Sequence, residues 1–554
     1  MILSSQEQIR EYTEKGWWGT DTIMDLALRN AQSTPDDVAL VDPPNRAQLT
    51  AGEPKRLTHA GVAEAMDRIA AGLLGAGIEQ DDIIMVQLPN IAELALIYLA
   101  AGRIGAIVSP LPVQYRTHEL RRVMGITEPK AFLTTTNFGD FNYVDMVQEL
   151  QPEFPSLQTV IAVGDDLPAG VLSLQEMLDT PHDEASLQAY LDKHETTAND
   201  ILTICWTSGT EAEPKGVPRS HNLWIWISYA SIDGCEMERG FHLLNPFPLI
   251  NMAGIGGMLV PWLIIGGRLV MHHPLDLPVF LGQIGAEQIN YTVVPPALLN
   301  MLLMRPELLG MADLSTLKNV GSGGAPLSPW MVTEYQEKYG IYVINIFGSN
   351  EGASFTSGPK ELPDPAERAQ FFPRFGVPGY EWASRVAAQM STKLVDPETK
   401  ETITEPGIPG EMAIKGGGIF SGYYARPDLT EKAFDDEGYF YTGDLFEIAG
   451  EEGNLNRYKF VGRVKDIIIR GGMNISSEEI EHLIIGHPKV ADVAVIPYPD
   501  QRLGEIVCAV VAPAQGETVT LEEIIEFLKG KDIAVYKLPE KLVVMDALPR
   551  NPVG

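Results

Sequence analysis

The sequence predicts an α/β protein with a large layered N-terminal domain that includes a β-rich subdomain, followed by a small α+β C-terminal domain. Three observations predict this fold. The chain of 554 residues is too long for a single hydrophobic core. Short apolar runs alternate with amphipathic stretches through the first 200 residues and beyond, as in layered α/β domains with largely parallel sheets. After residue 375 the runs become shorter and turns more frequent.

The spacing of apolar residues predicts the elements of the large domain in order. Helical intervals over residues 60–74 and 92–102 predict two helices, while the runs at 82–88 and 106–110 are typical of buried strands. The same reasoning predicts a helix at 330–339 and further strands at residues 201–206, 266–272, 289–294, 317–321 and 342–346. In the β-rich subdomain we expect short strands at 411–415 and 438–443.

A charged segment near residues 460–466 predicts a domain boundary, with the two domains at 1–461 and 462–554. Beyond it, Ser476 and Glu479 have the spacing of a capping box at the start of a helix. A second helix at 521–528 and strands at 493–497, 506–511 and 541–545 complete a compact α+β unit.

Composition excludes several classes of partner. With 41 Lys and Arg against 74 Asp and Glu, the net charge is −33, which repels nucleic acid and anionic lipid. Three cysteines without metal-site spacing and an N-terminus without a signal peptide favour a reducing, cytoplasmic compartment. Residues 241–267 carry no charge, but their prolines and glycines predict a strand, a turn and a core helix and not a membrane span.

The segment TSGTEAEPKG at 207–216 is the most informative part of the sequence. It follows a predicted buried strand and combines hydroxyls, two glycines and Lys215. Such loops bind phosphate, because backbone N–H groups approach the oxygens while lysine supplies a charge. The segment alone is equally compatible with an ordinary surface turn.

Other motifs support the phosphate interpretation. Glu351 follows the strand at 342–346 and could hold a magnesium ion that bridges phosphates, whereas residues 321–326 offer a flat backbone surface for a planar base. Asp444 follows a turn glycine and suits the two hydroxyls of a ribose. Arg463 and Lys465 precede the glycine pair Gly471 and Gly472, a pattern compatible with a hinge and a narrow ligand passage or with a charged linker followed by a hairpin.

In the order and spacing of these motifs the chain resembles the adenylate-forming superfamily, which includes acyl- and aryl-CoA synthetases, adenylation domains and beetle luciferases. The resemblance covers about residues 20–554 and is greatest to acyl-CoA synthetases. It implies a mobile C-terminal domain and a two-step reaction. A carboxylate attacks the α-phosphate of Mg-ATP to give acyl-AMP and pyrophosphate, and the thiol of coenzyme A then displaces AMP.

The resemblance also implies a role for individual residues. Lys215, Asn350 and Glu351 would be catalytic, Glu351 would bind Mg²⁺, and Lys465 would be the hinge about which the small domain turns. Gly471 and Gly472 would border the coenzyme A tunnel, and Asn251, Met252, Val294 and Gly348 would contact the acid. ATP would contact Thr207, Ser208, Gly209, Thr210, Lys215, Gly323, Gly324, Ala325, Asn345, Phe347, Gly348, Asp444 and Arg463.

Several positions depart from the family pattern. Glu211 and Ala212 replace the usual threonine and glycine of the phosphate loop, and we expect Glu211 to face solvent or to assist the metal. Asn350 stands where threonine is usual, and its amide can donate to the acyl carboxylate or to a phosphate oxygen. Asn251 is shared with aryl-acid ligases of siderophore pathways. The family's adenylation lysine is expected one residue after Gly554; a chain that ended there would adenylate poorly, and we expect the natural chain to continue.

The sequence leaves four functions open. The first is an acyl-CoA synthetase for a medium-size apolar aliphatic or alicyclic acid, and the second is an aryl-acid adenylating enzyme that loads a carrier protein. A luciferase-like oxygenase and a non-catalytic nucleotide-binding protein are the others. The identity of the acid and the oligomeric state, including a homodimer, are not decided by the sequence.

Overall fold

The computed structural model describes residues 1–207, 214–451, 454–470, 473–500, 503–531, 533 and 535–549. The chain divides into two compact units. Unit 1 comprises Met1–Ser391 and Lys415–Gly438, and unit 2 comprises Thr392–Ile414 and Tyr439–Gly554. The predicted domain boundary between residues 461 and 462 stays a prediction. The division into compact units is a different one, because it places the β-rich strands together with the C-terminal part.

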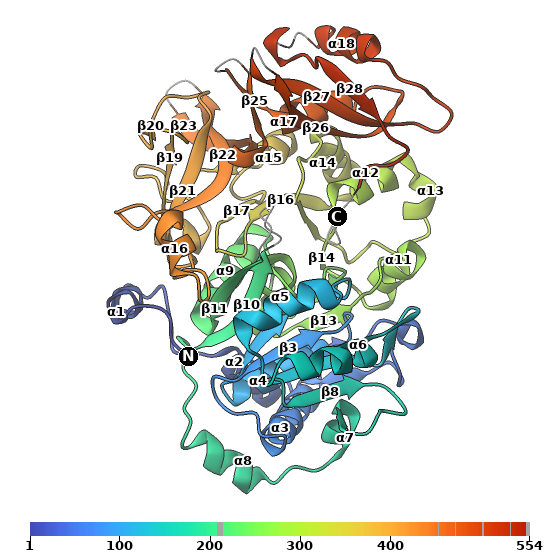
Figure 1. The fold of residues 1–554 in the computed structure, drawn as a ribbon, viewed down its shortest axis with the longest axis vertical. Coiled ribbons are helices and arrows are strands. Elements are labelled where there is room, and N and C mark those ends of the chain that lie inside the picture. Colours follow the sequence, from blue (N-terminus) through green and yellow to red (C-terminus); the bar gives the residue numbers. More distant parts are fainter. Residues whose placement is uncertain are drawn as a thin grey trace. The chain divides into compact units, whose positions relative to one another are not determined.

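The first sheet of unit 1 has eight strands, and its central six are parallel (Figure 1). An antiparallel strand closes each edge. The order is β17 (Ser354–Ser357), β16 (Tyr342–Gly348), β15 (Asn319–Gly323), β14 (Tyr291–Val293), β12 (His242–Asn245), β13 (Arg268–Met271), β1 (Val38–Val41) and β2 (Arg56–Thr58). Most side chains of the parallel strands are buried, as expected of a sheet covered on both faces.

The second sheet of unit 1 has seven strands, parallel except for the edge strand β11. The order is β11 (Lys215–Ser220), β10 (Ile201–Thr207), β4 (Ile107–Pro110), β3 (Ile83–Gln87), β5 (Ala131–Thr135), β8 (Thr159–Val163) and β9 (Val171–Ser173). The chain therefore returns antiparallel along β10 after residues 208–213, which places Lys215 opposite Thr207.

Helices cover the sheets of unit 1, as Figure 1 shows for α3 (His59–Gly75), α4 (Ala92–Arg103) and α6 (Tyr143–Leu150) around β3 and β8. Helix α4 is apolar except for Glu93 and Arg103 near its ends, and it is almost wholly buried, as expected for a helix enclosed by other elements. Thr58 and Ser220 cap α3 and α9 (His221–Gly234) through their side-chain oxygens. The predicted helices and strands of this region are thus confirmed, with ends that differ by a few residues.

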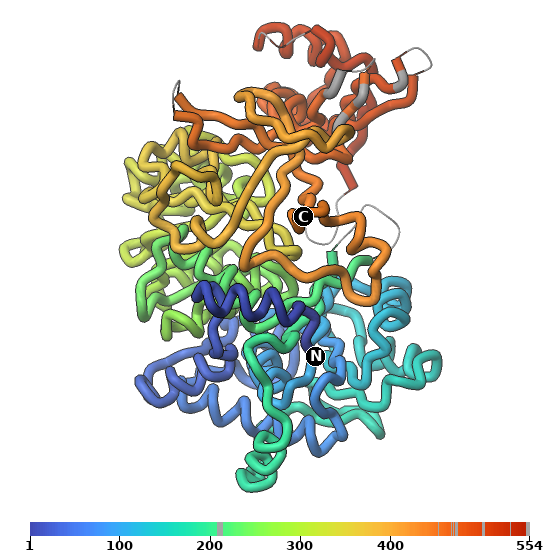
Figure 2. Tube along the Cα trace, turned by 90° about the vertical axis from the view of Figure 1, so that its left-hand side faces the viewer, coloured from blue at the N-terminus to red at the C-terminus, as the bar shows by residue number. Residues whose placement is uncertain are grey.

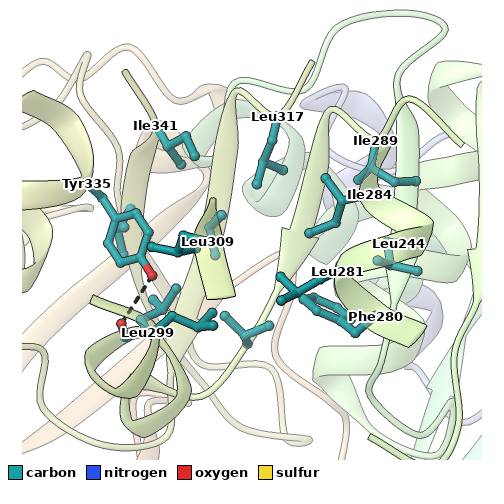
Figure 3. Close-up of a cluster of buried hydrophobic side chains, with 14 of the residues drawn as sticks. Leu244, Phe280, Leu281, Ile284, Ile289, Leu299, Leu309, Leu317, Tyr335 and Ile341 are labelled. Carbon is teal, nitrogen blue, oxygen red and sulfur yellow. Dashed lines mark hydrogen bonds between the residues drawn. The ribbon is translucent and has the colours of Figure 1, made fainter. Parts of the chain in front are cut away.

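A hydrophobic core packs α11 (Leu277–Ala286), α12 (Pro296–Met304) and α14 (Pro329–Glu334) against the first sheet. Figure 3 shows its side chains, among them Leu244, Phe280, Leu299, Leu317 and Ile341. The one polar tip labelled there, the hydroxyl of Tyr335, donates a 3.1 Å hydrogen bond to the Leu299 carbonyl. A buried tyrosine is tolerated in a core when its hydroxyl has such a partner.

Unit 1 also includes segment 415–438, which returns to the N-terminal end of the chain. The indole of Trp18 donates to the carbonyl of Gly417 at 2.8 Å, and the hydroxyls of Ser4 and Ser421 are 2.9 Å apart. In Figure 2 helix α1 (Gln6–Glu14, dark blue) runs beside this part of unit 1. Residues far apart in the sequence thus form one packed unit.

Unit 2 contains the β-rich strands predicted after residue 375 and the small α+β part. The first group follows the order β23 (Asn454–Arg463), β22 (Phe440–Glu451), β21 (Gly410–Gly416), β19 (Met390–Val395) and β20 (Thr402–Ile403). The second contains β25 (Met473–Ser476), β24 (Ile467–Arg470), β27 (Gly504–Pro513), β26 (Val490–Asp500) and β28 (Lys541–Val544), with helices α17 (Ser477–Ile484) and α18 (Leu521–Lys529).

Two details differ from the expectations. Ser476 caps α17 by accepting from the Glu479 N–H, but the Glu479 carboxylate binds Lys537 at 2.6 and 2.7 Å, so the reciprocal half of the capping box is absent among the contacts described for that helix. The predicted helix at 330–339 is α14 followed by a π-helix at Tyr335–Tyr339.

The uncharged segment 241–267 forms β12, a π-helix (Met252–Leu259) and α10 (Val260–Ile265). This confirms the predicted strand, turn and core helix. Within the described ranges, every helix is too short or too polar to cross a bilayer.

Candidate active site

Four parallel neighbours of the first sheet end close to one another. Strands β12, β14, β15 and β16 lie side by side, and the register pairs Val293 with Gly321 and Gly323 with Ile346 near their carboxyl ends. In open α/β sheets ligands bind at such ends. The predicted acid and adenine residues Asn251, Val294 and Gly324 follow β12, β14 and β15, and Gly348 is the last residue of β16, so the fold gathers them at one edge of the sheet.

A tight turn after β16 carries Asn350 and Glu351, two of the predicted catalytic residues. The N–H of Ser349 donates to the Ala353 carbonyl at 2.9 Å, and the N–H of Gly352 donates to the Ser349 carbonyl at 3.0 Å. Gly352 has φ of +112°, and a Cβ there would lie 1.9 Å from the Gly418 carbonyl oxygen. Only glycine therefore fits this position, because both its backbone conformation and its neighbour exclude a side chain. We call residues 349–352 the catalytic turn.

Asn350 joins the catalytic turn to the second sheet and to the π-helix. Its Oδ1 accepts from the Met252 N–H at 2.9 Å, and its Nδ2 donates to the Trp206 carbonyl at 3.3 Å. Trp206 precedes Thr207, the first residue of the predicted phosphate loop. An amide has two N–H donors, so a second one is chemically available to a carboxylate or phosphate oxygen. Its predicted role in binding stays a prediction.

Glu351 and Lys215 both contact Tyr423. The Tyr423 hydroxyl donates to Glu351 Oε1 at 3.0 Å, and Lys215 Nζ lies 5.3 Å from the centre of the Tyr423 ring. The N–H of Phe420 also donates to the Glu351 carbonyl at 2.9 Å. Segment 417–424 thus holds the backbone and the carboxylate of Glu351. The fold thus places Lys215 and Glu351, which were predicted from separate motifs, beside the same tyrosine.

The guanidinium of Arg219 lies fully buried behind the catalytic turn. It donates to the carbonyls of Asn350 at 2.9 Å, Leu223 at 2.9 Å and Gly418 at 3.2 Å. Burial lowers the pKa of Arg219 to about 10, and the nearby charge of Glu351 opposes that shift, so the group stays protonated at pH 7.

The residues expected to contact adenine differ in their exposure and in their neighbours. Gly324 and Ala325 are exposed after β15, and a Cβ on Gly323 would lie 2.0 Å from the Ile346 carbonyl oxygen. The Asn345 side chain is buried and donates to the Ala369 carbonyl at 3.0 Å. The Phe347 ring lies 6.0 Å from that of Phe355. Their contact with adenine stays a prediction.

The residues expected at the acid also differ among themselves. Met252 lies beside Gly348, since a Cβ on Gly348 would be 3.7 Å from Met252 Cγ. Asn251 caps the π-helix by accepting from the N–H groups of Ala253 and Gly254 at 3.1 and 3.3 Å. Val294 is a member of the buried core cluster. Met252 and Gly348 therefore have the surroundings that best suit an acid pocket, and all four roles stay predictions.

In unit 2, Asp444 and Arg463 are directly opposite on β22 and β23. Arg463 Nε donates to Asp444 Oδ1 at 3.1 Å, and Asp444 is buried while Arg463 is exposed. Lys465, the predicted hinge, lies exposed in a short 3-10 helix at Val464–Asp466.

The same unit contains a carboxyl group with a strongly raised pKa. Burial, and then the nearby carboxylates with Glu481 foremost, raise the pKa of Glu478 to about 7.

Part of the predicted site lies outside the described residues. This holds for Ser208, Gly209, Thr210, Glu211 and Ala212 of the phosphate loop and for Gly471 and Gly472 of the predicted coenzyme A passage. Their roles stay predictions.

Sequence reasoning missed Arg219 and Tyr423. Arg219 was detectable as a charged residue in the strand that begins at Lys215, although its partners at positions 350 and 418 are far away in the sequence. Tyr423 carries no local signal, because its contacts with Glu351 and Lys215 arise only on folding.

Family comparisons agree with this arrangement of motifs. The family described as "AMP-binding enzyme" matches residues 28–424, and "AMP-binding enzyme C-terminal domain" matches residues 479–554. The chain belongs to the AMP-binding enzyme family. The resemblance inferred from the sequence is thereby confirmed, together with the ligase type of the enzyme.

This AMP-binding enzyme has relatives that match it along nearly its whole length. A medium-chain fatty-acid–CoA ligase of Escherichia coli K12 is 34% identical, covering 100% of this chain and 92% of its own. An indoleacetate–CoA ligase of Aromatoleum aromaticum is 30% identical, covering 90% and 91%. The structure of ATP-bound MatB from Rhodopseudomonas palustris superposes with a TM-score of 0.77 at 26% identity, covering 96% of each chain.

Proposed function

We propose that this protein is an ATP-dependent carboxylic acid:CoA ligase that acts through an acyl-AMP intermediate. The observation that carries the proposal is the joining of Lys215 and Glu351 at Tyr423, beside a turn fixed to the end of β10. A lysine and a carboxylate at adjoining strand ends suit a polyphosphate and its counter-ion. Membership of the AMP-binding enzyme family supports the same nucleotide.

In the first half-reaction, an oxygen of the substrate carboxylate forms a bond to the α-phosphorus of ATP, and the bond to pyrophosphate breaks. Lys215 would balance the charge on the β- and γ-phosphates, and Thr207 would donate a hydrogen bond. In the second, the sulfur of coenzyme A attacks the acyl carbon, its proton is lost, and AMP leaves. Asp444 and Arg463 would bind the ribose in this scheme, and Lys465 would serve as the hinge between the two steps.

Glu351 is the residue that would bind Mg²⁺, and its carboxylate oxygens are the ligand type that this ion prefers. Among the described residues, no cluster of three or more His, Cys, Asp or Glu side chains could hold a metal ion. When bound, the ion would screen the negative charge of the triphosphate. The task of the protein here is to orient the Glu351 carboxylate, for which the Tyr423 hydroxyl is placed.

A medium-size apolar aliphatic or alicyclic acid is the substrate we favour. Met252 supplies a flexible apolar side chain beside Gly348, and thioether side chains adapt to acyl groups of varied shape. The medium-chain fatty-acid–CoA ligase among the relatives supports this class. The indoleacetate–CoA ligase supports an aryl acid as the second candidate, and Asn251 at the start of the π-helix agrees with it.

ATP–pyrophosphate exchange measured over a panel of aliphatic, alicyclic and aromatic acids tests the activity and its substrate. We expect the greatest exchange with medium-length aliphatic or alicyclic acids, and thioester formation with free coenzyme A. Preference for an aryl acid, with transfer only to a phosphopantetheine carrier protein, would replace the first candidate with the second. Absence of exchange with every acid would refute both.

A further inference from the structure

We propose that Arg219 is a positioning residue that holds the catalytic turn in place through backbone carbonyls. This inference deepens the proposed function and rests on it for its catalytic consequence. The residue is not itself expected to touch ATP or the acid. Its guanidinium would act by fixing the backbone from which Asn350 and Glu351 project.

The contacts of Arg219 connect three separate segments. Nη1 donates to the Asn350 carbonyl at 2.9 Å, while Nη2 donates to the carbonyls of Leu223 at 2.9 Å and Gly418 at 3.2 Å. The planar fork of arginine suits this task, since its N–H groups point in fixed directions from one rigid group. A lysine ammonium in this position would have neither the reach nor the geometry to serve all three.

The catalytic turn packs directly on this guanidinium. A Cβ on Gly352 would lie 3.1 Å from Arg219 Nη1 as well as 1.9 Å from the Gly418 oxygen. The turn, the guanidinium and segment 417–424 are therefore in van der Waals contact. The Phe420 N–H then donates to the Glu351 carbonyl, which ties the same two segments together a second time.

Burying the charge of Arg219 is unfavourable for the free energy of folding, so stability alone does not explain why this residue is buried. The side chain is completely buried, and Nε has no hydrogen-bond partner in the part of the chain that the structure describes. The guanidinium also lies 4.8 Å from the centre of the Trp224 ring, and this ring and the neutral carbonyls recover only part of the hydration that the buried cation loses. An apolar side chain of similar volume would avoid that loss. The position of the Arg219 charge beside the catalytic turn gives a functional reason for burying it.

Arg219 lies on the same strand as Lys215 and four residues after it. Both side chains reach segment 417–424, Lys215 at Tyr423 and Arg219 at Gly418. Residues four apart on a strand share a face. One strand therefore supplies the predicted phosphate lysine and the residue that fixes the turn of Glu351.

A matched control is present in the same unit. Arg368 is also completely buried, and it too binds backbone carbonyls, those of Val343 at 3.1 Å, Leu362 at 3.0 Å and Pro363 at 3.2 Å. Burial lowers its pKa to about 10, as for Arg219. It contacts none of residues 349–352 in the hydrogen bonds described for it. Arg368→Lys therefore measures the general cost of altering a buried guanidinium.

The test compares Arg219→Lys, Arg219→Gln and Arg368→Lys in the full chain. Backbone hydrogen exchange is followed at the amides of Ser349, Gly352 and Phe420, whose hydrogen bonds close the turn. We expect both Arg219 variants to accelerate exchange at these amides about tenfold, with Arg368→Lys unchanged there. In pyrophosphate exchange we expect kcat to fall about 100-fold in both Arg219 variants while KM for ATP stays within threefold.

Wild-type exchange rates at the three amides in either Arg219 variant would overturn the inference. So would a uniform acceleration across unit 1 that Arg368→Lys reproduces, because that pattern belongs to a merely stabilising residue. The hydrogen-exchange measurement does not need a substrate. If the wild-type protein activates no acid, the proposed function fails, and the amide data still decide whether Arg219 positions the turn.

Discussion

The hydroxyl of Tyr423 donates a 3.0 Å hydrogen bond to Oε1 of Glu351, and the same ring lies 5.3 Å from the ammonium of Lys215. A carboxylate that accepts such a bond has fewer orientations open to it. Tyr423 therefore sets the direction of the predicted magnesium ligand before substrate arrives, which is the condition for efficient electrostatic stabilisation.

Tyr423→Phe removes only this hydroxyl. We expect the Mg²⁺ concentration for half-maximal pyrophosphate exchange to rise about tenfold, the effect of losing one hydrogen bond to a charged group. Tyr424→Phe is the control, since the Tyr424 ring packs against the hydrophobic cluster of the second sheet. An unchanged magnesium dependence in Tyr423→Phe would show that the hydroxyl does not orient Glu351.

Asp444→Asn tests the predicted ribose site. A carboxylate accepts hydrogen bonds from two ribose hydroxyls better than an amide does, so KM for ATP should rise about tenfold, with a smaller effect on kcat. Glu447→Gln serves as the control, because Glu447 lies on the same strand but opposite Lys459. Equal effects of the two substitutions on KM would remove Asp444 from the ATP site.

Gly352→Ala should both destabilise the protein and abolish activity. The added Cβ would approach the Gly418 oxygen to 1.9 Å at a φ of +112°, and we expect a loss of roughly 2–4 kcal/mol in the free energy of unfolding. Gly125→Ala, inside α5 (Thr117–Thr127), meets nothing within 4 Å and should stabilise by about 0.5–1 kcal/mol. Urea unfolding of the two variants measures the difference, and equal stabilities would contradict the packing described.

Glu478 should make the protein less stable as pH rises. Burial, and then the charges of Glu481, Asp466 and Asp444, raise its folded-state pKa from 4.5 to about 7. Between these values the unfolded chain has released a proton that the folded state still binds, so unfolding becomes easier with increasing pH. Glu478→Gln should remove this dependence and gain about 1 kcal/mol at pH 8, once solvent screening is allowed for.

Glu522→Gln controls for charge at a helix start, because Glu522 is an exposed residue in the first turn of α18, whereas Glu478 is a partly buried residue in the first turn of α17. Thermal unfolding from pH 4 to pH 8 compares the two variants with the wild type. A wild-type pH profile in Glu478→Gln would contradict the assignment.

The sequence predicted the elements well where apolar periodicity is strong. Residues 82–88 were expected as a strand and form β3 at Ile83–Gln87, and residues 60–74 were expected as a helix and form α3 at His59–Gly75. Local spacing decides such elements, because the buried face must repeat with the period of the backbone.

Tertiary partners were not predictable in this way. The Glu479 carboxylate binds Lys537, 58 residues further along the chain, in place of the capping partner that was expected at the start of its own helix. Arg219 acquires its role from carbonyls at positions 350 and 418. The motif residues Lys215 and Glu351 were found because residue type and spacing express their chemistry, whereas the groups that hold them depend on the folded arrangement.

The parallel strands β12, β14, β15 and β16 keep most of their side chains in the core, while many of the residues expected to contact substrates lie at or after their carboxyl ends. We therefore expect folding stability to depend mainly on the strands and the choice of acid mainly on the connections that follow them. Exchange of the short connections after β12 and β16 between relatives should alter which acid is selected while leaving the unfolding transition nearly unchanged. For this scaffold, redirecting the enzyme to a new acid is a problem of loop exchange, separable from the redesign of its interior.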